Sequence, residues 1–269
     1  MDDTKELAQT YTVVNNTQYD AGRFLIKRLE LEPGMRVLDV GCGPGNLTAY
    51  LADLVGERGE VIGIDPSKER IALAHQTFDT GSSTPTKSNL TFHVGCAEDL
   101  SQFPTASFDV LYCNSTLHWV VDQPRAIREF SRVLKPGGRL GVSGQSGDFV
   151  AAHESIKADV LSRAPYRDYD HNTAGQPKFL KQQEMGTLLD AAGFAGRSFT
   201  TNKIFKSTKD GAEMVDWLSS SSSGKTYGGI PVDMRPRARE EMIAEWDKLT
   251  TKEGLTMELD LLVTVATKA

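Results

Sequence analysis

Hydrophobic residues in the first half of the chain form short runs that alternate with segments of helical periodicity. A run of four to six mostly apolar residues bounded by glycine or polar residues predicts a buried strand. Segments in which apolar residues recur every three or four positions predict helices. Strands that alternate with helices are typical of a parallel sheet covered on both faces. The predicted strands are 36–40, 61–64, 90–94, 108–113 and 139–143, and the predicted helices are 20–31, 47–55, 67–78 and 125–134.

The second half of the chain has a less regular pattern. Residues 144–179 contain many small and polar residues and are expected to run over the surface without regular structure. The serine-rich stretch 219–223 is expected to be a mobile linker. Further helices are predicted at 181–192, 210–219 and 236–249, and further strands at 197–205 and 259–265.

Composition and charge narrow the expected partners. The 269 residues suffice for one large α/β domain, and the net charge of −6 disfavours a nucleic-acid partner, because phosphate binding requires a basic surface. The three cysteines lack the spacing of a zinc site, so we expect no metal. No apolar run is long enough to span a membrane, and the polar first residues do not resemble a secretory signal. We therefore expect a cytoplasmic protein with no membrane partner.

A glycine-rich turn follows the first predicted strand. Residues 37–45 read VLDVGCGPG, so Gly41, Gly43 and Gly45 form a GxGxG pattern. Glycines at this position allow a ligand to approach the backbone closely. Asp65 ends the next predicted strand, twenty residues after Gly45, a spacing that suits an acceptor for both hydroxyls of a ribose. The alternatives are a plain strand-to-helix connection and, for Asp65, an N-cap ahead of Pro66.

Asp39, just before the glycines, indicates which nucleoside is bound. A carboxylate at the end of the first strand would face the amino-acid end of a ligand and pair with an ammonium group. S-adenosylmethionine carries such a group and NAD does not. The GxGxG pattern also lacks the additional residue of the dinucleotide pattern GxGxxG. We therefore expect S-adenosylmethionine as the cofactor and S-adenosylhomocysteine as its product.

The chain resembles the class I S-adenosylmethionine-dependent methyltransferases in five motifs. They are the glycine turn with Asp39, Asp65, VGCAEDL at 94–100, FDVLYCN at 108–114 and LKPGGRL at 134–140. The resemblance covers the first half of the chain. It implies an α/β, Rossmann-like fold with a seven-stranded, mostly parallel sheet, helices on both faces and a small helical cap. It also implies one structural domain, with a lid segment at 1–20, a cofactor-binding core at 21–145, and a substrate cap plus the completing strands at 146–269.

The resemblance further implies which residues contact the cofactor. In the family, the residues after the third strand hold the adenine, and here these are Cys96, Ala97 and Glu98. Members usually carry Asp where this chain has Cys96, and because a thiol is a poor acceptor we expect only a van der Waals contact from it. The full set expected to bind the cofactor is Tyr11, Asp39, Gly41, Cys42, Gly43, Gly45, Asp65, Pro66, Cys96, Ala97, Glu98, Asn114 and Ser115.

The segment 114–120, NSTLHWV, follows the fourth strand and should border the transferred methyl group. It resembles the corresponding segment of the trans-aconitate and the insect juvenile-hormone-acid methyltransferases, which methylate a carboxylate of a small molecule. The segment 15–18, NNTQ, resembles the substrate-contacting N-terminal segment of the juvenile-hormone-acid enzymes. Together the two resemblances imply Gln18 and Trp119 as substrate residues. His118 is a candidate general base, a hydrogen-bonding pocket residue or a structural histidine.

We therefore expect methyl transfer to a carboxylate oxygen of a small molecule, by a monomer or weak homodimer. The alternatives are nitrogen, carbon or phenolic oxygen acceptors, and a protein that binds the cofactor without transferring its methyl group.

Overall fold

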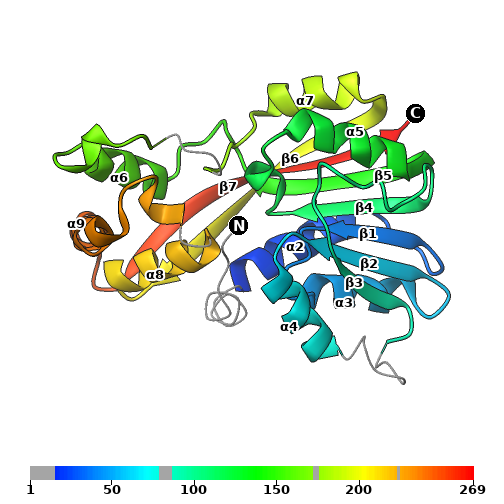
Figure 1. The fold of residues 1–269 in the computed structure, drawn as a ribbon, viewed down its shortest axis with the longest axis horizontal. Coiled ribbons are helices and arrows are strands. Elements are labelled where there is room, and N and C mark those ends of the chain that lie inside the picture. The colour runs from blue at the N-terminus through cyan, green and yellow to red at the C-terminus, as the bar shows by residue number, and fades with distance from the viewer. Residues whose placement is uncertain (1–15, 79–86, 172–175, 223–224) are drawn as a thin grey trace.

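The computed structural model describes residues 16–78, 87–171, 176–222 and 225–269. Seven strands in these ranges form one sheet in the order β3-β2-β1-β4-β5-β7-β6 (Figure 1). Their bounds are β1 (Arg36–Val40), β2 (Glu60–Asp65), β3 (Leu90–Val94), β4 (Phe108–Asn114), β5 (Leu134–Gln145), β6 (Phe194–Thr208) and β7 (Leu255–Lys268).

Five of the strands run in parallel. β1 pairs with β2 and β4, β2 pairs with β3, and β4 pairs with β5. β7 lies antiparallel between β5 and β6. The predicted α/β, Rossmann-like fold with a seven-stranded, mostly parallel sheet is therefore confirmed.

Helices cover both faces of this sheet (Figure 1). On one face α2 (Asn16–Arg28), α3 (Asn46–Val55) and α4 (Lys68–Phe78) supply residues to a buried apolar cluster. On the other face α5 (Gln123–Val133) and α7 (Gln182–Ala191) supply a second cluster. Side chains alternate between the two clusters along β4, because successive strand residues point to opposite faces.

β6 and β7 continue beyond the sheet as a two-stranded ribbon. β5 pairs with β7 only over 261–267, whereas β6 pairs with β7 as far as Leu255. Three helices pack on this extension and form the cap (Figure 1): α6 (Ala152–Leu161), α8 (Gly211–Ser221) and α9 (Arg235–Asp247). The cap has its own buried cluster, which contains Trp217, Met242, Trp246 and Met257.

Two expectations for the second half were wrong. Residues 152–161 form α6 rather than an irregular segment, and Ser219–Ser221 complete α8 rather than starting a linker. Within α6 only Val160 and Leu161 are buried, so its apolar pattern is weak, and packing against α9 stabilises it instead. The hydroxyl of Ser220 is buried and donates to the carbonyl of Asp216, as a helix allows.

Candidate functional site

The glycine turn after β1 is tightly enclosed. Gly41 has a φ of +80°, and a Cβ there would lie 2.0 Å from Thr116 Oγ1. Gly45 has a φ of +87°, and its Cβ would lie 2.5 Å from the ring of Phe92. The amides of Gly41 and Cys42 donate to the carbonyl of Ile64 at 2.8 and 3.0 Å. The turn is therefore held between the ends of β2 and β4, and only glycine fits at these positions.

Asp39 is a buried carboxylate next to this turn, with 2% of its surface exposed. Its Oδ2 accepts a hydrogen bond of 2.7 Å from the hydroxyl of Thr48. Burial raises the pKa of Asp39 to about 7; the Thr48 bond opposes this rise and the nearby charge of Asp65 adds to it. Among the described residues no Lys or Arg forms a salt bridge with Asp39. The site therefore contains a carboxylate without a cation.

Asp65 joins the end of β2 to the glycine turn. Its Oδ2 accepts from the amide of Gly43 at 3.0 Å, and its Oδ1 accepts from the amide of Ser67 at 2.9 Å. The N-cap interpretation of Asp65 was wrong, because the hydroxyl of Ser67 accepts from the amide of Arg70 in the first turn of α4. Pro66, which lies between them, is exposed.

The segment predicted to hold adenine follows β3 at the same edge of the sheet. Cys96 is half-buried, Ala97 is buried, and Glu98 accepts a hydrogen bond of 3.1 Å from the amide of Val121. Cys42 is buried in the turn, and burial raises its thiol pKa well above the ordinary range. The predicted cofactor residues thus lie at or just after the ends of four neighbouring strands, β1 to β4. Tyr11, which was also predicted to bind the cofactor, lies outside the described residues.

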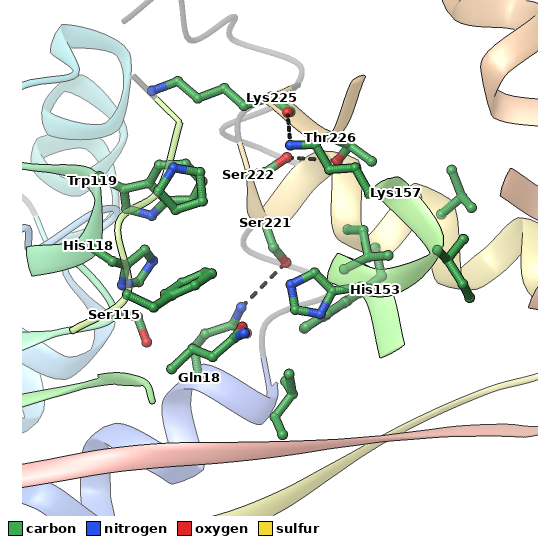
Figure 2. A pocket seen from close by; sticks show the side chains of 18 of the residues that line it. Gln18, Ser115, His118, Trp119, His153, Lys157, Ser221, Ser222, Lys225 and Thr226 are labelled. Atoms are coloured by element: carbon green, nitrogen blue, oxygen red, sulfur yellow. Dashed lines mark hydrogen bonds between the residues drawn. The ribbon is translucent and has the colours of Figure 1, made fainter. Parts of the chain in front are cut away.

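A cavity of about 160 Å³ lies between the end of β4 and the cap. Gln18, Ser115, His118 and Trp119 line it on the sheet side, and Figure 2 shows His153 and Lys157 of α6 facing them from the cap. The structure therefore brings the three residues predicted for the substrate side, Gln18, His118 and Trp119, to one cavity. Much of the remaining wall is apolar and includes Ile156, Phe179, Ile204, Val215, Trp217, Leu218, Met242, Trp246, Leu259 and Leu261.

Gln18 connects the sheet to the cap. Its backbone carbonyl accepts from Asn114 Nδ2 at 3.3 Å. Its side-chain Nε2 donates to Ser221 Oγ of α8, also at 3.3 Å (Figure 2). The side-chain oxygens of Gln18 and Asn114 are buried and have no hydrogen-bond partner among the described residues. Both are acceptors that a ligand N–H or O–H group can satisfy.

The two imidazoles of the cavity are poor bases. The ring of His118 lies 5.0 Å from that of Trp119 and 5.2 Å from that of Phe179, measured between centroids. Burial, and to a smaller extent the proximity of His153, lower the pKa of His118 to about 3. Burial and then Lys157 lower the pKa of His153 to about 4. Both side chains are therefore neutral near pH 7.

The sequence did not distinguish two lysines that line the cavity. Lys157 Nζ donates to Gln176 Oε1 at 2.6 Å and to the carbonyl of Lys225 at 3.3 Å. Lys225 Nζ lies 5.0 Å from the ring centroid of Trp119. Burial lowers the pKa of both ammonium groups. Lys157 was missed with α6 itself, although the spacing of His153 and Lys157 would place them on one helix face.

The described ranges contain no cluster of three His, Cys, Asp or Glu side chains that could bind a metal ion. None of their helices is both long and apolar enough to cross a membrane.

Comparison with known proteins agrees with this geometry. Residues 31–193 match a family described as a methyltransferase domain. The chain is 34% identical over 216 residues to an arsenite methyltransferase of Aquipseudomonas alcaligenes, covering 74% of this chain but 62% of that protein. It is 31% identical over 181 residues to a 2-phytyl-1,4-naphtoquinone methyltransferase of Synechococcus elongatus, covering 64% of this chain and 76% of that protein.

Among solved structures, the YcgJ protein of Bacillus subtilis has the same fold, with a TM-score of 0.63 and 21% identity over 93% of this chain and 98% of that one. The strand order, the enclosed glycine turn and the matched domain lead to one conclusion. The chain belongs to the class I S-adenosylmethionine-dependent methyltransferase family.

Proposed function

We propose that this protein transfers the methyl group of S-adenosylmethionine to a carboxylate oxygen of a small molecule held in the cavity. The observation that carries the proposal is that the same cavity is lined by weakly basic imidazoles and by two lysines that form no salt bridge with a carboxylate of the described residues. The resemblance of segment 114–120 to small-molecule carboxyl methyltransferases supports the same acceptor.

The residues at the ends of β1 and β2 fit the cofactor. When bound, S-adenosylmethionine supplies a methyl group on a positively charged sulfur. Asp39 would hold its ammonium, which provides the cation that this buried carboxylate lacks. Asp65 would hold the ribose hydroxyls, because its acceptor-only carboxylate ends β2 and is fixed beside the glycine turn by the amides of Gly43 and Ser67. Cys96, Ala97 and Glu98 would border the adenine.

The acceptor side requires no strong base. A carboxylic acid has an ordinary pKa of about 4 and is ionised near pH 7. A phenol would have to lose a proton to a base of matched pKa, and His118, with a pKa of about 3, is far from that match. We therefore assign orientation rather than proton transfer to Gln18, His118 and Trp119. Positioning and exclusion of water can together lower a barrier by roughly 7–11 kcal/mol.

A second candidate is methyl transfer to a carbon atom of an apolar ring. The apolar wall of the cavity favours it, and the Synechococcus relative is named for a naphthoquinone substrate. Arsenite, for which the Aquipseudomonas relative is named, fits this cavity less well as a substrate. Thiolates are the usual ligands of soft ions, and none of the three cysteines lines the cavity.

The test is product analysis with isotopically methyl-labelled S-adenosylmethionine and two acceptor panels, carboxylic acids and naphthoquinones. We expect label in methyl esters, which mild base cleaves. Label in a base-stable product from the quinones would instead establish the second candidate. Binding of S-adenosylhomocysteine without any labelled product from either panel would contradict both candidates.

A further inference from the structure

Lys157 presents a positive charge to an otherwise largely apolar cavity. Its ammonium has three donors, of which two bind Gln176 Oε1 and the carbonyl of Lys225. Both of these acceptors are neutral. No carboxylate lies within salt-bridge distance of Lys157 in the described part of the chain. The third donor and the charge are therefore available to a ligand.

Glu154, the carboxylate nearest in sequence, interacts with Lys157 through its charge, but its hydrogen bonds are made to other groups. Its Oε2 accepts from Gln145 Nε2 at 2.5 Å and from the amide of Ala151 at 3.1 Å, which holds it at the start of α6. Glu154 does not line the cavity, whereas Lys157 and His153 do. The Nδ1 atom of His153 is also buried without a hydrogen-bond partner among the described residues. A neutral imidazole can donate one hydrogen bond, so His153 can assist Lys157 in holding an anion.

Lys225 is the second lysine that lines the cavity, and with Lys157 it forms a positively charged part of the wall, called here the charged roof. Its backbone carbonyl binds Lys157, and its ammonium lies over Trp119 (Figure 2). The two lysines thus lie above the space between Trp119 and His153. Trp217, Met242 and Trp246 of the cap cluster line the same cavity.

From these contacts we propose that Lys157 determines the acceptor specificity, by binding the carboxylate of an amphipathic monocarboxylic acid whose apolar body packs against Trp217, Met242 and Trp246. The identity of the reaction rests on the proposed function, but binding of the acid does not. A half-buried ammonium whose hydrogen-bond acceptors are both neutral gains more from a ligand with negative charge than from a neutral one. The apolar wall in turn selects acids with an extended hydrocarbon part over short ones.

The test is calorimetric titration of the protein saturated with S-adenosylhomocysteine, using decanoate, decanamide and acetate. We expect binding of decanoate and at least tenfold weaker binding of the other two, because decanamide lacks the charge and acetate lacks the apolar body. In Lys157→Met the affinity for decanoate should fall about 10- to 100-fold, the usual range for loss of a charged hydrogen bond. Lys157→Arg should restore most of it.

Lys206→Met is the matched control. The Lys206 ammonium lies 5.4 Å from the ring of Trp217 but does not line the cavity, so decanoate affinity should be unchanged. Unchanged affinity for S-adenosylhomocysteine would show that each variant is folded. Equal affinity of the wild type for decanoate and decanamide would overturn the proposal even if Lys157→Met does not fold.

The two proposals fail separately. If decanoate binding depends on Lys157 but no ester forms, the specificity inference holds and carboxyl methylation fails. If esters form equally well in wild type and Lys157→Met, carboxyl methylation holds and the inference is overturned.

Discussion

Affinity for S-adenosylhomocysteine should decrease as the pH falls below about 7, because Asp39 must be ionised to pair with the ligand's ammonium. In the ligand-free protein burial raises the pKa of Asp39 to about 7, so at lower pH this carboxyl is mostly protonated. An adjacent ammonium favours the ionised form and lowers the pKa of Asp39 in the complex. Binding at low pH therefore releases a proton, and this release costs free energy.

The size of the effect follows from the pKa. For one group that ionises on binding, Kd rises tenfold per pH unit well below its pKa and is constant well above it. Between pH 8 and pH 6 we therefore expect about a tenfold loss of affinity, or ~1.4 kcal/mol. With the ordinary value of 3.8 there would be almost no change in this interval. His118 and His153, with pKa values of about 3 and 4, stay neutral throughout.

Isothermal titration calorimetry in buffers of different ionisation enthalpy measures both Kd and the number of protons released. Asp39→Asn is the control, since asparagine keeps the shape and can still accept from Thr48. It should bind at least tenfold more weakly at pH 8, because a charged hydrogen bond contributes about 1.5–3 kcal/mol, and its Kd should not vary with pH. A pH-independent Kd in the wild type, or the same slope in Asp39→Asn, would refute the role of Asp39.

Two other predictions concern stability, each measured by urea unfolding followed through tryptophan fluorescence. The raised pKa of Asp39 favours the folded, ligand-free state at low pH, and this contribution to stability is lost as the pH rises from about 4 through 7. At pH 8 the wild type buries an ionised carboxylate and Asp39→Asn buries a neutral amide. The variant should therefore be more stable than the wild type at pH 8. Greater stability of the wild type at pH 8 would contradict this. Gly41→Ala should be less stable than Gly193→Ala by about 1–3 kcal/mol, because both place Ala at a φ near +80° but only Gly41 faces Thr116. Equal losses would show that the turn is not held against Thr116.

The sheet and the cofactor edge were predictable because their signals are local. β1, β2 and β4 are buried on both faces and therefore read as short apolar runs. The glycine turn needs positive φ angles that only glycine adopts readily, and Asp39 and Asp65 follow from their positions at strand ends. Each of these features is encoded within a few residues of the atoms it positions.

The cap and its charged roof were not predictable in the same way. α6 has little apolar periodicity, and its stability depends on α9, more than seventy residues away in sequence. The role of Lys157 depends on Gln176 and on the carbonyl of Lys225, which only the folded chain brings together. A lysine that lines a cavity has the same local sequence pattern as one that is solvated.

The β6–β7 ribbon belongs to two parts of the molecule at once. Its inner half completes the sheet, its outer half belongs to the cap cluster, and Ile204 contacts the clusters of both. The cap helices are inserted on either side of β6, so they can diverge or be exchanged while the register that aligns the strand ends stays the same. Chimeras that transplant 146–180 and 209–254 between homologues should therefore carry acceptor preference with them and leave the nucleoside site of the recipient unchanged.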